Sequence, residues 1–422
     1  MSGQTLKMIY GVNQADACQA FALGEASGLM QQRLRDVGTR MIRLFLYDKG
    51  APDPVTEWPI FASYVEAVLK VGARPMITFA KMHKPVNDLA AVEEFADRSG
   101  DVVRRCLEYW GPDVVRDWYW CVWNEPNNEW ISGPVTFAEY RHVYEQVADR
   151  CLRWLKPHLA GRRPLIGGPG VEGFQPFWLD WVWRFLNEID NELIGFVDWH
   201  LYGDWREHGE NNAPADPILH RRMLMGMVGE YGHRARIIGD MLKGRQMLNI
   251  CGELNCHSHY TQPVRERFNY SVFAGSYYAA ALLQLMRQDV DAEMFWVGTE
   301  DQGGYGMLNK HAEPWPSFHT KWLVAQHVRY GDALAFPTGE GGNGSLDLVS
   351  ASGDDGRRSV VVVHQKEEST RYDLAALVPE TMGLRTVLKI DGQGQGIVTT
   401  PYDGFLQFDG FGVAAVTTDP RR

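Results

Sequence analysis

Between residues 7 and 297, short apolar runs alternate with longer segments of mixed polarity. The runs begin 32 to 51 residues apart, so each interval has room for a strand, a helix and two loops. Their residues are apolar on both faces, as in buried parallel strands. The eight runs are residues 7–12, 41–46, 75–79, 118–123, 164–166, 196–201, 247–251 and 292–297. This pattern predicts eight βα units.

The segments between the runs carry apolar residues at helical spacing, and the clearest cover residues 61–69, 103–110, 137–144 and 178–186. Helices alternating with eight parallel strands predict an α/β fold, the (β/α)8 TIM barrel. The competing fold is an open, doubly wound sheet, whose usual marker is a glycine-rich turn after the first strand. Here the first strand ends at Asn13 and Gln14 with no such turn, which disfavours the open sheet.

After about residue 330 the pattern changes to short alternating runs, separated by clusters of Gly and Asp. These runs are residues 359–364, 384–390, 405–408 and 413–418. A period of two predicts antiparallel strands, and about 90 residues suffice for a small sandwich. We therefore expect a barrel over residues 1–330 and a small C-terminal antiparallel β-sandwich domain over residues 331–422, the latter in a supporting role.

The composition is that of an ordinary globular protein, with 45% hydrophobic and 23% charged residues. A net charge of −11 is unsuited to following a phosphate backbone, so we expect no nucleic-acid partner. The sequence contains neither a leader-like opening nor a long apolar window, which predicts no membrane association and a cytoplasmic location. Six cysteines are too sparse for a disulfide scaffold and indicate reduced thiols. The oligomeric state stays open, with a homo-oligomer as one outcome.

Two glutamates follow predicted strands at the end of the barrel where functional side chains gather. Glu125 follows the fourth run and Glu253 follows the seventh. Cleavage of a glycosidic bond needs a proton donor for the leaving oxygen and a nucleophile or an activated water for the anomeric carbon. Two carboxyl groups held close together can divide these roles, because like charges push their pKa values apart. The pair therefore predicts glycoside cleavage.

Structural explanations exist for the same residue types. Glu125 could be an acid at the N-terminal end of a helix, where the helix dipole favours it. Glu253 could form a salt bridge with a neighbour, and His200 could be a hydrogen-bonded core histidine. For these three residues the structural and the functional interpretations are both open at this point.

A group of possible metal ligands lies beside the second glutamate. It consists of Cys251, Cys256, His257 and His259. Their spacing matches no common zinc pattern, and the glutamate would be trapped among them. We therefore expect no metal and no cofactor, and a metal-dependent hydrolase is kept only as an alternative that a chelator can test.

The sequence Trp-Asn-Glu-Pro-Asn at residues 123–127 resembles the acid/base motif of the clan A retaining glycoside hydrolases. Further segments, in the same order, resemble glycoside hydrolase family 39, the family of β-xylosidases and α-iduronidases. These segments are residues 123–130, 166–169, 198–203, 295–296 and 303–308. The resemblance covers most of residues 7–310, and the family's layout of a barrel with a β-sandwich accommodates the tail.

The resemblance implies that Glu125 is the acid/base and Glu253 the nucleophile of a double displacement through a covalent glycosyl-enzyme. It also implies that Tyr202 donates to Glu253, and that Trp296 floors the sugar subsite and precedes a non-proline cis peptide bond. Stacking on sugar gives a use to a chain with 15 tryptophans. The residues expected to bind substrate or orient the nucleophile are Asn124, Arg43, His200, Tyr202 and Trp296.

Three more residues are expected to bind substrate at the rim of the barrel. His83 follows the third run, Glu172 follows the fifth, and His257 lies in the polar segment 255–260 after the seventh. The chain departs from the family around the nucleophile, because Gly252 stands where the family usually has Thr.

The predicted protein is a retaining glycoside hydrolase, exo-acting and β-xylosidase-like, on short or conjugated glycosides. The alternatives within the clan are an endo-acting polysaccharide hydrolase and a β-glucosidase or arabinosidase. The alternative from another class is a carbohydrate-binding barrel without turnover, and the presence of both Glu125 and Glu253 argues against it.

Overall fold

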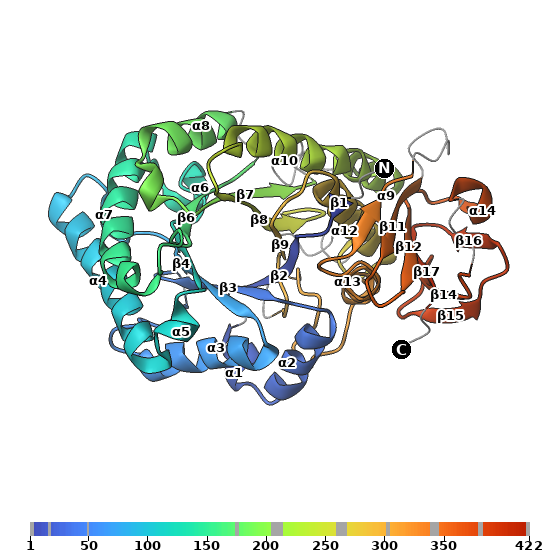
Figure 1. Cartoon of the computed structure of the whole chain (residues 1–422), viewed down its shortest axis with the longest axis horizontal. Coiled ribbons are helices and arrows are strands. Elements are labelled where there is room, and N and C mark those ends of the chain that lie inside the picture. The colour runs from blue at the N-terminus through green and yellow to red at the C-terminus, as the bar shows by residue number, and fades with distance from the viewer. Residues whose placement is uncertain are drawn as a thin grey trace.

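Eight parallel strands close into a barrel at the centre of the protein (Figure 1). The structure is a computed structural model that describes residues 4–15, 18–48, 50–173, 177–203, 214–258, 268–300, 304–337, 346–378 and 383–418. The barrel strands, in order around the ring, are β2 (Ile9–Gln14), β3 (Met41–Leu46), β4 (Arg74–Phe79), β5 (Tyr119–Val122), β6 (Ile166–Val171), β7 (Phe196–Tyr202), β8 (Leu248–Asn255) and β9 (Ala292–Phe295). The predicted TIM barrel is confirmed.

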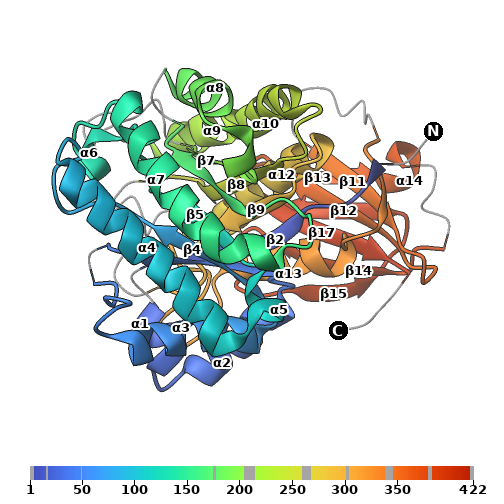
Figure 2. The same ribbon diagram turned by 60° about the vertical axis from the view of Figure 1, so that its left-hand side comes forward.

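Helices form the outer layer of the barrel (Figures 1 and 2). They are α1 (Cys18–Leu23), α2 (Ser27–Asp36), α3 (Trp58–Val71), α4 (Leu89–Trp110), α5 (Pro112–Val115), α6 (Glu129–Ser132), α7 (Phe137–Leu155), α8 (Trp178–Glu188), α9 (Pro217–Gly226), α10 (Val228–Leu242), α12 (Val272–Arg287) and α13 (Pro316–His327), with short 3-10 turns η1 (Lys156–His158) and η2 (Asn191–Leu193). The four segments with helical spacing lie in α3, α4, α7 and α8, as predicted. Helix α7 begins with a capping box, in which Thr136 and Glu139 bond each other's backbone amides.

The barrel interior changes from apolar to polar along the strands. Its lower part is an apolar cluster that includes Met41, Met76 and Phe196. Side chains two positions further along a strand point to the same face, and those positions hold Arg43, Thr78 and Asp198, all fully buried. The carboxyl end of the barrel is therefore lined by polar groups that rest on an apolar floor.

The C-terminal part is antiparallel, as predicted, and consists of a seven-stranded and a two-stranded sheet beside the barrel (Figure 2). The large sheet has the order β1 (Gln4–Thr5), β10 (Ala333–Ala335), β11 (Leu346–Ser352), β12 (Arg358–His364), β17 (Gly412–Thr417), β14 (Thr386–Asp391) and β15 (Val398–Pro401). The small sheet pairs β13 (Ser369–Asp373) with β16 (Phe405–Asp409), and α14 (Leu374–Leu377) follows β13.

Residues of β12 alternate between two cores. Val361 and Val363 belong to the main core with the barrel helices, whereas Val360 and Val362 pack in a second core with residues of the small sheet. The large sheet is thus buried on both faces, which joins it firmly to α12 and α13. Because β1 comes from the N-terminal end of the chain and pairs with β10, the sheet draws on both ends of the sequence.

The fifth barrel strand differs from the prediction. It was expected over residues 164–166 but covers Ile166–Val171, so the Gly-Gly-Pro-Gly segment is strand rather than loop. Gly167 is required there, because a Cβ would lie 2.4 Å from the Phe196 carbonyl oxygen. Strand propensity does not identify this segment, because close contact with the neighbouring strand requires glycine at position 167 rather than a β-branched residue.

All six cysteines are buried. Among the described residues, no helix combines the length and the apolar character needed to cross a membrane.

Candidate active site

Glu125 lies in a tight segment directly after β5. Trp123 and Glu125 have φ values of 77° and 50°, a left-handed conformation that is uncommon outside glycine. The Glu125 amide donates to the Gly170 carbonyl at 2.9 Å, and the Ser132 hydroxyl donates to the Glu125 carbonyl at 3.0 Å. These bonds hold the segment in its unusual conformation and direct the Glu125 side chain over the barrel mouth.

Glu253 lies inside β8, at a bulge. Against β7, Trp199 pairs with Cys251 and His200 pairs with Glu253, so Gly252 is an extra residue in the strand. Bulges re-aim the side chains next to them and are common beside active sites. The bulge turns Glu253 toward the barrel axis, where its side chain is almost completely buried.

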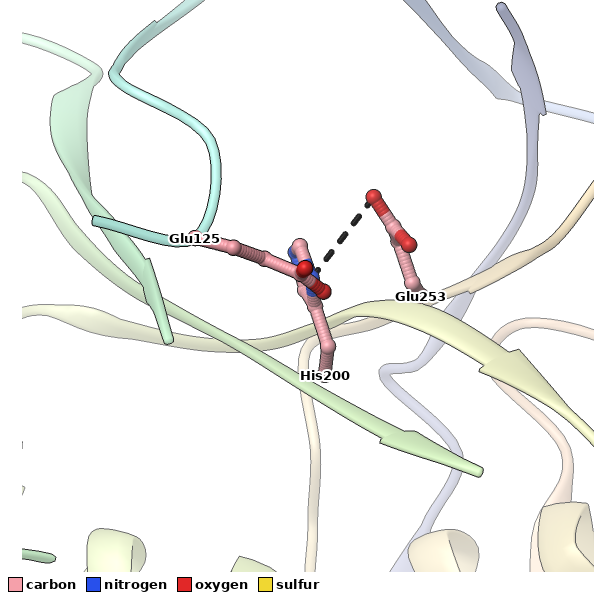
Figure 3. Close-up of side chains that lie close together, drawn as sticks. All are labelled: Glu125, His200 and Glu253. Carbon is pink, nitrogen blue, oxygen red and sulfur yellow. Dashed lines mark hydrogen bonds and ion pairs between the residues drawn. The ribbon is translucent and has the colours of Figure 1, made fainter. Parts of the chain in front are cut away.

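His200 lies between the two glutamates (Figure 3). Its Nδ1 is 2.8 Å from Glu125 Oε1 and 3.6 Å from Glu253 Oε1. One carboxyl oxygen of each glutamate and a ring nitrogen of His200 all lie within 4.8 Å of one another. Retaining glycosidases hold their carboxyl groups about 5–5.5 Å apart, whereas inverting enzymes leave about 6.5–9.5 Å for a water. The spacing is thus typical of the retaining arrangement.

Arg43 donates to polar side chains from three other parts of the barrel. Its Nε donates to Thr78 Oγ1 at 2.7 Å, its Nη1 to Glu253 Oε1 at 3.4 Å, and its Nη2 to Asn124 Oδ1 at 3.1 Å. A guanidinium presents its donors in a rigid plane. Arg43 therefore fixes Glu253 and Asn124 relative to each other.

The groups around Glu253 shift the pKa of its carboxyl in opposite directions. Burial raises the pKa of its carboxyl, and Glu125 adds to this effect, whereas His200, Arg43 and the Tyr202 hydroxyl lower it; the result is about 7. Tyr202 donates to Glu253 Oε2 at 2.6 Å.

The contacts of His200 fit a ring with its proton on Nδ1. This nitrogen faces Glu125, and Nε2 lies 3.0 Å from Arg43 Nη1, a group that only donates. Burial and the Arg43 donor oppose a second proton, on Nε2, whereas Glu253, Asp198 and Glu125 favour it and raise the pKa of His200 above its usual range, so Nδ1 holds a proton in both charge states of the ring. His200 is thus a proton-holding partner of Glu125.

Glu125, His200 and Glu253 are also the described group whose residue types and spacing could hold a metal ion. Arg43 Nη1 lies 3.4 Å from Glu253 Oε1 and 3.0 Å from His200 Nε2. A fixed positive charge beside two of the three ligands opposes a cation there. The donor set fits two carboxyl groups sharing a proton better than it fits a metal.

Trp296 directly follows β9. Its ring meets Phe45 edge-on, with 5.7 Å between ring centroids, and Phe45 lies under the Arg43 guanidinium. The Trp296–Val297 peptide bond is cis, as the sequence resemblance implied. The Asn255 side chain donates to the Trp296 carbonyl at 2.6 Å and fixes the residue against β8.

The other three predicted rim residues lie in different surroundings. His83 is exposed and lines a surface pocket with Tyr47 and Arg98. Glu172 is buried, and its backbone is held by the Asn127 side chain. His257 is buried, with its Nε2 3.0 Å from Asn269 Oδ1. Their expected role in substrate binding remains a prediction. His259, from the same polar segment, lies outside the described residues.

Sequence reasoning missed several residues of the site. Asp198 has the clearest signal, because it precedes His200 and Tyr202 by two and four positions on one strand and so shares their face. Asn128 donates to Glu125 Oε2 at 3.1 Å from the turn into α6. Thr78 has no such signal, because only the closed barrel brings it to Arg43.

Comparison with known proteins adds independent information. The family described as Glycosyl hydrolases family 39 matches residues 59–325, more than half of the chain. A β-xylosidase of Geobacillus stearothermophilus is 23% identical in an alignment of 361 residues that covers 78% of this chain and 66% of that protein. The match therefore spans slightly less than two thirds of the relative's length.

Solved structures share the fold over nearly the whole chain. A GH39 β-xylosidase from Caulobacter crescentus has a TM-score of 0.66 and 14% identity, with 100% of this chain and 98% of that chain covered. The GH39 enzyme from Xanthomonas axonopodis pv. citri has a TM-score of 0.63 and 15% identity, with 99% and 95% covered. At these identities the likeness establishes the fold.

Proposed function

The chain belongs to glycosyl hydrolase family 39, and from that premise we propose that it is a retaining glycosidase with Glu253 as nucleophile and Glu125 as acid/base. One observation carries the proposal: the two carboxyl groups and His200 meet within 4.8 Å at the carboxyl end of the barrel. This is the spacing for direct attack on the sugar rather than for attack through a water.

The hydrogen bonds support this division of roles. Tyr202, Arg43 and His200 all face Glu253, and these groups favour its ionised form. An ionised carboxylate can attack the anomeric carbon. Glu125 faces His200, which can hold or return the proton that an acid/base must exchange in each half of the reaction.

The reaction then has two displacements. A Glu253 oxygen bonds to the anomeric carbon as the bond to the leaving oxygen breaks, and Glu125 gives its proton to that oxygen. In the second step Glu125 takes a proton from water, whose oxygen bonds to the anomeric carbon and releases Glu253. We expect Asn124, whose side-chain oxygen accepts from Arg43, to bond the sugar 2-hydroxyl.

We assign β-xylosides as the substrate class and exo action as the mode. The assignment is supported by the relatives described as β-xylosidases. Trp296 offers an indole face for stacking on a sugar, which suits a substrate bound by a few well-placed polar groups.

A panel of nitrophenyl glycosides tests the proposed function, followed by xylo-oligosaccharides and polymeric xylan. We expect the highest kcat/KM on the β-xyloside, release of single xylose units, and a first product with retained β-configuration by NMR. A preference for a β-glucoside or an arabinoside would change the sugar, rapid shortening of xylan would change the mode, and an inverted product would overturn the mechanism.

A further inference from the structure

A third carboxylate, Asp198, lies beneath the two glutamates in the polar layer of the barrel. It is fully buried on β7. Its Oδ2 is 3.3 Å from Arg43 Nη2, 3.7 Å from His200 Nε2, and accepts from the Cys121 thiol at 3.4 Å. Asp198 therefore contacts Arg43 and His200 on the side away from the glutamates. Arg43 contacts Glu253, and His200 contacts both Glu125 and Glu253.

Two glycines make the space that Asp198 occupies. A Cβ on Gly252 would lie 1.8 Å from Asp198 Oδ1, and a Cβ on Gly170 would lie 3.2 Å from Oδ2. Gly252 is the bulge residue that precedes Glu253, and the Gly170 carbonyl accepts from the Glu125 amide. The backbone that positions each glutamate is thus shaped around the Asp198 carboxylate.

This carboxylate is not explained by packing or by hydrogen bonding alone. Among the described residues its Oδ1 has no hydrogen-bond partner, although it is buried. A buried carboxylate oxygen without a donor lowers stability, so a functional reason for keeping it should be sought. Asp198 therefore affects its neighbours mainly through its negative charge.

We propose that Asp198 is a positioning residue of this site: it holds Arg43 and His200 on the side away from the glutamates, and its negative charge balances that of Arg43 beside Glu253. The proposal rests on the proposed function. The charged groups that face His200 are Glu125 after β5, Glu253 on β8, Arg43 on β3 and Asp198 on β7.

The direction of the effect follows from the charges. Without the negative charge of Asp198, the positive charge of Arg43 is less balanced and favours the ionised form of Glu253. His200 loses one of the carboxylates that favour its protonation, and the surroundings of Glu125 become less negative. Glu253 and His200 should then lose their protons at lower pH.

The variant Asp198→Asn tests the proposal, because it removes the charge and keeps the shape. We expect the pH profile of kcat/KM to move down by about one pH unit, the low end of the range for the effect of a nearby charge. Limbs that coincide with those of the wild-type protein would overturn the proposal. Asp332→Asn is the matched control, since Asp332 is also buried against an arginine, Arg357 at 2.7 Å, but in another part of the protein.

A measurement without substrate separates this proposal from the proposed function. NMR of the labelled His200 ring, assigned by loss of its signal in His200→Asn, should show titration about one pH unit lower in Asp198→Asn than in the wild-type protein. If the wild-type protein cleaves no glycoside, the proposed function fails, and the titration still decides the role of Asp198. An unchanged titration would overturn the proposal.

Gly252→Ala, made in the wild-type protein and in an Asp198→Ala background, tests whether the position of the Asp198 carboxylate matters. Gly252→Ala should displace Asp198, lower the melting temperature and move the pH limbs in the same direction as Asp198→Asn. In an Asp198→Ala background the same substitution should lower the melting temperature little, because the space that the Asp198 carboxylate fills is then empty. An unchanged pH profile in Gly252→Ala, or equal losses in both backgrounds, would contradict the proposal.

Discussion

The Tyr202 hydroxyl donates to Glu253 Oε2 at 2.6 Å, from a neighbouring strand of the same barrel. It is the shortest contact of the proposed nucleophile with a neutral donor, and it lowers the pKa of a carboxyl that burial raises. The contact makes an ionised nucleophile available near neutral pH in a site that is nearly closed to water.

Tyr202→Phe removes this donor and leaves the ring. We expect the pKa of Glu253 to rise above its present value of about 7, so the acid limb of kcat/KM should move up by about one pH unit. Loss of a hydrogen bond to a charged group costs about 1.5–3 kcal/mol, which corresponds to about a 10- to 100-fold lower kcat/KM below neutral pH. The control is Tyr144→Phe, which removes a bond to the Leu193 carbonyl and should leave the limb in place.

Glu125→Gln tests the acid/base role. Without a proton for the leaving oxygen, kcat/KM on glycosides with poor leaving groups should fall by about 100- to 10,000-fold. Glycosides with good leaving groups should lose far less in the first step. Glu129→Gln, an exposed neighbour on α6, is the control and should behave as wild type. Full activity of Glu125→Gln on poor leaving groups would remove Glu125 from this role.

Trp296→Ala tests the sugar platform. The variant lacks the apolar indole face that the sugar would cover. KM should therefore rise by about 10- to 100-fold, which corresponds to a loss of about 1.4–2.8 kcal/mol of binding free energy. The control is Trp154→Ala, which removes a half-exposed indole from the outer helix α7. If both variants bind the substrate as wild type does, Trp296 is not the platform.

The buried Glu253 should destabilise the folded protein at alkaline pH. Its pKa is about 7 when folded, against 4.5 for an ordinary Glu, so its ionisation opposes folding. The stability that its protonated form provides is fully present below pH 4.5 and is lost as the pH rises through 7. At pH 8 the loss is on the order of 3 kcal/mol, from about 1.4 kcal/mol per pKa unit.

Glu253→Gln should therefore be more stable than wild type at pH 8 and about equal to it at pH 4. Chemical denaturation at both pH values measures the difference. Glu192→Gln, at an exposed position, should show no such dependence. Equal stability of Glu253→Gln and wild type at pH 8 would mean that burial of Glu253 carries no cost.

The barrel and the two glutamates could be predicted from the sequence because both depend on local signals. The apolar runs mark strands, and Glu125 and Glu253 stand at or just after the ends of two of them. The course of β6 could not be predicted, since Gly167 is selected by contact with Phe196, which is 29 positions away. Strand periodicity could also have pointed to Asp198, two positions before His200.

The rim residues show what strand-end reasoning leaves open. His83 and Glu172 both follow barrel strands, yet one turns to solvent and the other is buried beside Asn127. The direction of a side chain in a loop depends on backbone angles that no local periodicity specifies. Arg43 and Asn124 were identified from the resemblance to family 39, and they lie on a barrel strand and just after one.

The central claim is that Glu253 forms the covalent bond to the sugar. A 2-deoxy-2-fluoro-β-xyloside with a good leaving group should trap the glycosyl-enzyme, because the fluorine slows its hydrolysis more than a good leaving group slows its formation. Peptide mass spectrometry should then place one sugar on Glu253, and Glu253→Gln should remain unlabelled. A label on any other residue, or an inverted product with no label, would contradict the account.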